Sequence, residues 1–152
     1  MIPRPTTEKL ILECCHNLEQ LVAPEVGASA AQQALAVIAT TLRTAAVRSA
    51  HEVAWMLEET DLMAAYARAG LDALSGTPEV ADIVAPEPAA SYHLDDVVSA
   101  YEAGSIVLAR LLELAADAGE DELRAQGRAI LARRIDRENE INGAYVLVGR
   151  DD

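Results

Sequence analysis

The residues best able to do chemistry lie on one predicted helix near the C-terminus. Arg134, Glu138 and Asn142 follow one another at intervals of four residues, on the same helical stripe as the apolar Ile130 and Ile141. Because burying an unpaired charge costs several kcal/mol, we expect Arg134 and Glu138 to be mostly buried and to pair with each other or with a neighbouring helix. A buried arginine also binds planar acidic groups well, which leaves open a carboxylate-binding pocket around Arg134.

A second candidate surface lies in the segment 29–68, which contains neither proline nor glycine. Val47, His51 and Trp55 lie on the face opposite the main apolar stripe of this segment, and His51 and Trp55 are close enough in sequence to touch on one helical face. A helix that is apolar on two sides is either central in its fold or covered by another subunit. We therefore predict a homodimer whose interface includes these three residues. A wall of a ligand pocket, or an acid–base role for His51, remains the alternative.

The sequence holds no complete catalytic or metal-binding pattern. Glu13 and His16 have the Glu-x-x-His spacing of ferritin-like metal sites, but such a site needs a second copy of the motif and two further carboxylates. Both side chains point away from the apolar stripe of their helix, so we expect them to face solvent. There is no glycine-rich phosphate loop, no Gly-x-Ser-x-Gly and no His-Glu-x-x-His. We predict neither a metal nor a cofactor.

Helices must position all these side chains, because the composition is that of an all-helical protein. Alanine supplies 30 of the 152 residues, phenylalanine is absent, and the six prolines leave 25–77 and 89–152 free of the strongest helix breaker. We predict an all-α, up-and-down four-helix bundle with one additional short helix and a long proline-containing connection. The whole chain, 1–152, is expected to form a single domain.

Apolar periodicity and helix-stop residues set the expected bounds. A first helix follows Thr7 and ends at Pro24 and Gly27, and a second begins at Ser29. Since 40 residues would span about 60 Å, too long for a compact domain, we expect a break near 59–61 and a short helix over 62–74. The proline-rich residues 75–90 form the connection, which could cover a site. Two further helices run from about 91 to Gly119 and from 120 to about 143, followed by an apolar tail at 144–148.

Charge and the cysteines restrict the partners and the compartment. The net charge of −13 argues against nucleic acid and anionic membranes as partners. The longest uninterrupted apolar run, Ala34 to Ala39, is far shorter than a membrane span, and the N-terminus has no signal-peptide core. Cys14 and Cys15 are adjacent, which does not suit an ordinary disulfide, so we expect buried, reduced thiols. A cytoplasmic protein is expected.

The two ends of the chain resemble a known family. Arg4-Pro5-Thr6 followed by Leu10, with the closing Ile130-Leu131-Ala132-Arg133 and Asn142-x-x-Tyr145, resembles an uncharacterised bacterial family of small helical proteins. Its members are often encoded beside aminoglycoside-phosphotransferase-like kinases and acyl-CoA dehydrogenases. The resemblance implies an accessory protein near acyl-thioester or phosphoryl-transfer metabolism, and it implies no particular catalytic residue.

Two functions from different classes follow. The first is a non-enzymatic cytoplasmic accessory or interaction protein that dimerises through its second helix and leaves room for a further protein partner. The alternative is a helical bundle, binding or enzymatic, that takes a small acidic ligand in a pocket lined by Arg134, Glu138, Tyr101 and His51.

Overall fold

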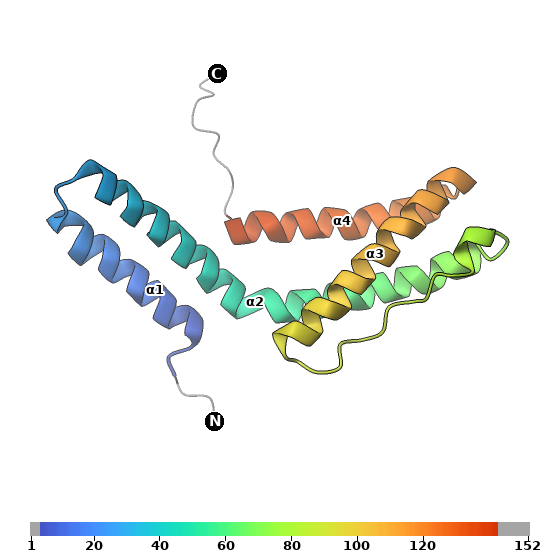
Figure 1. Ribbon diagram of the computed structural model, residues 1–152, viewed down its shortest axis with the longest axis horizontal. Helices are drawn as coiled ribbons and strands as arrows, with labels where there is room; N and C mark the ends of the chain where they lie inside the picture. Colours follow the sequence, from blue (N-terminus) through green and yellow to red (C-terminus); the bar gives the residue numbers. More distant parts are fainter. Residues whose placement is uncertain (1–3, 143–152) are drawn as a thin grey trace, which may run out of the picture. The chain divides into compact units, whose positions relative to one another are not determined.

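The computed structural model describes residues 4–142, and the tail predicted at 144–148 lies outside that range. Within the described residues the fold is all-α, with no strand (Figure 1). The helices are α1 (Thr7–Asn17), α2 (Ser29–Ala73), α3 (Leu94–Ala118) and α4 (Asp121–Asn142). The predicted all-α class and the long connection after the second helix are confirmed.

The chain divides into two compact units. Among the described residues, the N-terminal unit holds 4–52 together with 139–142, and the C-terminal unit is Val53–Glu138. Helix α2 contributes its first part to one unit and its second part to the other.

The predicted break within the second helix is wrong, because α2 continues without interruption to Ala73. Glu59 and Thr60 do not cap a new helix: each is only 3% exposed and faces the core of the C-terminal unit. The Thr60 hydroxyl donates to the Met56 carbonyl oxygen at 2.8 Å, one turn earlier in the same helix. A helix of this length is too long for one compact unit, but α2 runs through two units.

In the N-terminal unit, α1 and the first part of α2 pack through small side chains. The buried residues Cys15, Ala39 and Ala46 form this contact, and the Cys15 thiol donates to the Ala39 carbonyl oxygen at 3.5 Å. Cys14 is exposed, so the expectation of two buried thiols holds only for Cys15. A π-helical turn (Leu18–Val22) and a 3-10 turn (Ala23–Glu25) end the first helical segment before Pro24 and Gly27, close to the predicted stop.

In the C-terminal unit, the second part of α2 packs with α3 and α4 around a larger core. Met63, Val97, Leu108 and Leu111 are its largest fully buried side chains. The connection after α2 belongs to this core, because Val80 of its 3-10 turn (Pro78–Val80) is buried and Ile83 and Ala85 pack beside it. Helix α3 ends at Gly119, whose positive φ of 75° closes the helix as the sequence predicts.

No helix in the part of the chain that the structure describes is long and apolar enough to cross a membrane.

Candidate functional site

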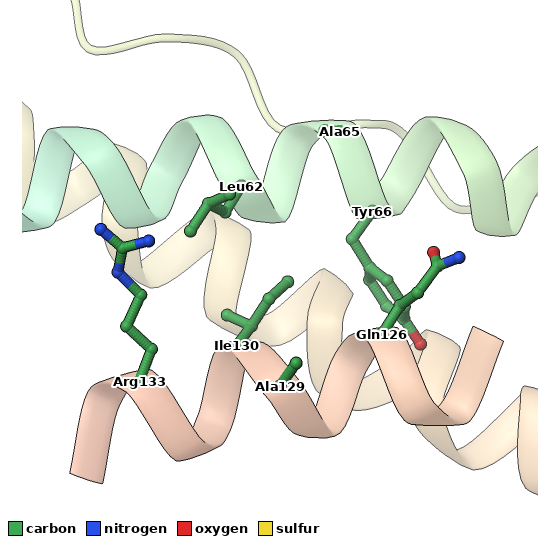
Figure 2. Close-up of a pocket in the computed structure, with 7 residues that line it drawn as sticks. All are labelled: Leu62, Ala65, Tyr66, Gln126, Ala129, Ile130 and Arg133. Atoms are coloured by element: carbon green, nitrogen blue, oxygen red, sulfur yellow. The ribbon is translucent and has the colours of Figure 1, made fainter. Parts of the chain in front are cut away.

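A groove follows the contact between α2 and α4 in the C-terminal unit (Figure 2). Its volume is about 410 Å³. The lining residues are Leu62, Ala65, Tyr66, Gln126, Ala129, Ile130 and Arg133. Arg133 lies toward one end of the groove, and Tyr66 and Gln126 lie toward the other.

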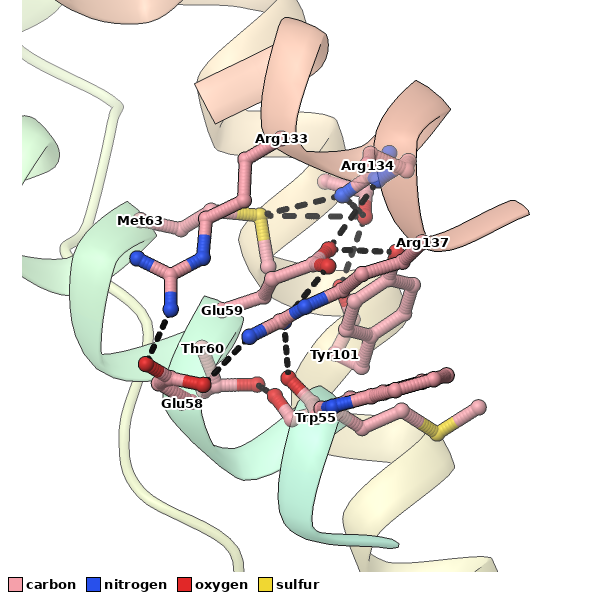
Figure 3. A network of polar contacts seen from close by, with 11 residues as sticks. Trp55, Glu58, Glu59, Thr60, Met63, Tyr101, Arg133, Arg134 and Arg137 are labelled. Carbon is pink, nitrogen blue, oxygen red and sulfur yellow. Dashed lines mark hydrogen bonds and ion pairs between the residues drawn. The ribbon is translucent and has the colours of Figure 1, made fainter. Parts of the chain in front are cut away.

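Beside this groove, charged side chains from α2 and α4 meet polar side chains of α3 in one network (Figure 3). Three arginines of α4 face two glutamates of α2. The network consists of Glu58, Glu59, Tyr101, Ser105, Arg133, Arg134 and Arg137.

Glu59 is the centre of the network, with a side chain that is only 4% exposed. Its Oε1 accepts a hydrogen bond from Arg137 Nη1 at 2.8 Å. Its Oε2 accepts from Arg134 Nε at 3.2 Å and from the Tyr101 hydroxyl at 2.9 Å. A buried carboxylate needs such partners to remain charged at low cost, and here both oxygens have them.

Arg137 is the buried arginine, with a side chain 10% exposed. Besides Glu59 it donates to the Trp55 carbonyl oxygen at 2.9 Å and forms an ion pair with Glu58. Its guanidinium carbon lies 5.6 Å from the centroid of the Trp55 ring, within range of a cation–π contact. One side chain thus joins Trp55 and both glutamates of the network to α4.

Arg134 connects the network to α3. Its Nη2 donates to the Ser105 hydroxyl at 3.2 Å, and its guanidinium carbon lies 4.7 Å from the centroid of the Tyr101 ring. Since its Nε is bound to Glu59, the side chain is held by a carboxylate, a hydroxyl and an aromatic ring at once.

Of the two pairings expected for Arg134, the one with a neighbouring helix is confirmed, because Arg134 binds Glu59 of α2. The expected burial of Glu138 and its pairing with Arg134 are wrong, since Glu138 is exposed. The buried Glu59 carboxylate needs a cationic partner, whereas an exposed i, i+4 pair contributes little. Arg134 itself is partly buried, with a side chain 24% exposed.

Glu59, Arg133 and Arg137 were not predicted as site residues, although the sequence carries a signal for two of them. Glu59 lies three residues after Met56 and four before Met63, which places a carboxylate on an apolar stripe of the second helix. Arg137 follows Ile130 by seven residues and therefore shares its face. Charged residues at such positions indicate a buried ion pair.

The structure brings Arg134 and Tyr101 together, but the groove between α2 and α4 is not lined by Arg134, Glu138, Tyr101 or His51, and the pocket predicted around them stays a prediction. Arg137 joins Trp55 to the same network. His51 and Val47 belong to the N-terminal unit, where His51 is exposed and Val47 half-buried. The interface predicted at Val47, His51 and Trp55 stays a prediction. Glu13 and His16 are both exposed, as expected.

The network determines which of its titratable groups are charged at neutral pH. Burial, together with the hydrogen bond and charge of Glu59, raises the pKa of Tyr101 to about 12, a rise that Arg134 opposes and Glu138 adds to. Desolvation acts to raise the pKa of Glu58, but the charges and hydrogen bonds of Arg133 and Arg137 outweigh it and hold this pKa below its ordinary value. At neutral pH the phenol is therefore neutral and the carboxylate is charged.

The raised pKa of Tyr101 predicts a loss of stability in strong base. A folded-state pKa above the unfolded value of about 10 stabilises the fold below pH 10, and this stabilisation is lost as pH rises toward 12. Ultraviolet titration of the tyrosines, with helix content followed by circular dichroism, should show Tyr101 ionising in that window as helix is lost. Burial also raises the pKa of Tyr66, so two late phenols are expected in the native chain. Tyr101→Phe should remove one of them, and Tyr92→Phe, which removes an exposed phenol, should remove neither. Two late phenols in Tyr101→Phe would contradict the assignment.

Chemically, the network is a set of mutually satisfied charges, in which each oxygen of Glu58 and Glu59 accepts from at least one arginine. Among residues 4–142, no group of three or more histidine, cysteine, aspartate or glutamate residues is placed to hold a metal ion. No model of a known protein family, no curated protein and no solved structure matches this chain.

Proposed function

We propose that this chain is a non-enzymatic accessory protein that works by self-association, and that the first part of α2 provides the dimer contact. The observation that supports this proposal most strongly is the amount of apolar surface left uncovered on the N-terminal unit. Six of its large apolar side chains are exposed: Leu10, Leu12, Leu21, Val22, Val37 and Ile38.

Two of these six side chains, Leu10 and Ile38, lie on one face of the helix pair together with three smaller ones. At about 100° per residue, Leu10 and Cys14 lie on the same flank of α1, and Ala34, Ile38 and Ala45 lie on one flank of α2. The two helices run antiparallel and pack through Cys15 and Ala39, which places both flanks on the same side of the helix pair (Figure 1). We call these five flank residues the open face. The Glu19–Arg43 ion pair lies on the opposite side.

A second copy of this chain is the partner that suits the open face. The chain carries a net charge of −13, so most of its surface repels another copy. The stretch of α2 from Ser29 to His51, however, contains no aspartate or glutamate at all. Two open faces can therefore meet about a two-fold axis without repulsion between carboxylates of this stretch of α2, and two helix pairs together make a four-helix arrangement.

The energetics also support association. Among the described residues of this unit, the fully buried apolar side chains are the small ones of Cys15, Ala39 and Ala46, and a helix as short as the 11-residue α1 is marginal without a packed apolar face. Covering the open face with its own copy would stabilise both N-terminal units. Because the carboxylates of the C-terminal network are already bound by arginines, we place the function in association and not in catalysis. A cytoplasmic role beside acyl-thioester or phosphoryl-transfer enzymes is part of this proposal.

Cys14 provides a direct test, because it is an exposed thiol on the open face. We expect alkylation of Cys14 to be fast in dilute protein and to slow as the protein concentration rises, in proportion to the dimer present. Cys15, which is buried in the N-terminal unit, serves as the internal control and should react slowly throughout.

Two outcomes would contradict the proposal. Fast alkylation of Cys14 at every concentration would mean that the open face stays uncovered. Slow alkylation at every concentration would mean that the same chain covers it.

A further inference from the structure

The walls of the groove between α2 and α4 are apolar, and the side chains at its middle are small. Ala65 of α2 and Ala129 of α4 are both exposed there, with Leu62 and Ile130 beside them (Figure 2). Further exposed alanines lie one turn away on the same flanks: Ala69 on α2 and Ala125 on α4. Because these side chains are short, another chain can approach the backbones of both helices closely.

Carboxylates lie one heptad to each side of the two central alanines. On α2 they are Glu58 and Asp72, and on α4 they are Glu122 and Asp136. Residues seven apart share a helical face, so each wall of the groove has an acidic residue at both of its ends. The two carboxylates of one wall are roughly 21 Å apart along the helix axis.

Three of these four carboxylates are available to a positively charged partner. Glu58 is already paired with Arg133. Asp72, Glu122 and Asp136 are exposed, and none of them forms an ion pair within the part of the chain that the structure describes. The apolar groove is therefore bordered by negative charge.

The negative charge is strongest at one end of the groove. Helices α2 and α4 run antiparallel along it, so Asp72 and Glu122 lie together at the end that holds Tyr66 and Gln126 (Figure 2). At the other end, Asp136 is the carboxylate without a cationic neighbour in an ion pair.

An amphipathic helix of another protein matches this surface. Such helices bind grooves between two helices through apolar side chains spaced three and four residues apart. Carboxylates at both ends favour lysine or arginine beside that stripe, and the net charge of −13 attracts a basic partner. A second copy of this chain is less suitable, because the two arginines of its acid-free stretch of α2, Arg43 and Arg48, are already paired with Glu19 and Glu52.

We infer that this groove binds an amphipathic helix of a partner protein that carries basic side chains at both ends of its apolar stripe. The distance between the acidic ends corresponds to a helix of about 15 residues. The stripe lies between Ala65 and Ala129, and the basic side chains pair with Asp72, Glu122 and Asp136. This inference is independent of self-association, because the groove belongs to the C-terminal unit.

Fluorescence anisotropy of labelled peptides, titrated with the full chain, tests the occupant. The lysine peptide is an amphipathic helix of about 20 residues, long enough to be helical, with two lysines at each end of a leucine–alanine stripe. A second peptide has glutamates in place of the lysines, and a third has the composition of the first in an order without a stripe. A fourth peptide, residues 29–51 of this chain, represents a second copy.

We expect saturable binding of the lysine peptide at micromolar concentration, weakened by added salt. The other three peptides should bind at least about tenfold more weakly, because each lacks the stripe or the available basic side chains. Equal binding of the lysine peptide and the peptide without a stripe would overturn the inference, as would tightest binding of peptide 29–51. The absence of saturable binding of the lysine peptide at millimolar concentration would also overturn it.

Two pairs of variants locate the binding surface. Ala129→Gln places a larger neutral side chain at the middle of the groove and should weaken the lysine peptide by about tenfold or more. Ala103→Gln, on the exposed face of α3, is the matched control and should leave the affinity unchanged. An Ala129→Gln chain with native affinity would contradict docking in this groove.

The acidic ends are tested by removing two charges at a time. Asp72→Asn combined with Glu122→Gln should weaken the lysine peptide by roughly three- to tenfold at low salt. Glu102→Gln combined with Asp117→Asn removes the same charge from exposed positions of α3 and should leave the affinity nearly unchanged. Equal losses in the two double variants would mean that net charge alone attracts the peptide, which contradicts the inference.

Discussion

Replacing Glu59 with leucine should destabilise the C-terminal unit by about 3–5 kcal/mol, the usual cost of removing one partner from a buried ion pair. The substitution removes the carboxylate that binds Arg134, Arg137 and Tyr101. Arg137 would keep only its contacts with Glu58 and the Trp55 carbonyl while remaining buried. A loss of this size is a large fraction of the stability of a small domain, and chemical denaturation would measure it.

Two comparisons separate this effect from a general loss of packing. Glu58→Gln alters a half-exposed carboxylate in the same network and should cost far less stability than Glu59→Leu. The triple variant Glu59→Leu, Arg134→Met, Arg137→Met removes the uncompensated charges and should be more stable than Glu59→Leu alone. If Glu59→Leu unfolds at the denaturant concentration of the native chain, the buried network does not stabilise this unit.

The sequence predicts the helices well because their ends depend on local chemistry. Pro24 and Gly27 end the first helical segment, and Gly119 ends α3 in the conformation that glycine adopts most easily. The break expected near Glu59 failed for a non-local reason. A glutamate and a threonine resemble a helix start, and only the packing of α3 and α4 around them keeps the helix continuous.

The candidate site could be predicted only in part. The sequence indicates that Arg134 lies on an apolar stripe and needs a buried partner, but an interval of four residues made Glu138 the obvious choice. The actual partner, Glu59, is 75 residues away in sequence. Pairing across helices depends on their crossing and register, which the residue types do not determine.

Residue types alone predict that the second helix is apolar on two sides, but they do not predict which of its residues are most exposed. Ile38 and Ala39 are neighbours on α2, but the small Ala39 is buried and the larger Ile38 is 47% exposed. Small side chains at Cys15 and Ala39 let the two helices approach closely, so the contact centres on them. The larger Ile38 is left on the flank, where it forms part of the open face.

Replacing Ile38 with glutamate should abolish self-association. In a dimer formed through the open face, this change places a carboxylate in each half of an apolar contact that contains no acidic residue of α2. The cost of burying two unpaired charges should weaken association at least ~100-fold. Val37→Glu is the matched control, because Val37 is 66% exposed and points away from α1, so it should leave association unchanged. Trp55→Ala tests the alternative interface at Val47, His51 and Trp55.

Sedimentation velocity over a range of micromolar concentrations, with the native chain and these three variants, tests self-association most directly. The account predicts a concentration-dependent dimer for the native chain, Val37→Glu and Trp55→Ala, and a monomer for Ile38→Glu. A native chain that remains a monomer at every concentration would contradict the proposed function. A dimer that survives Ile38→Glu but is lost in Trp55→Ala would contradict the open face as its interface.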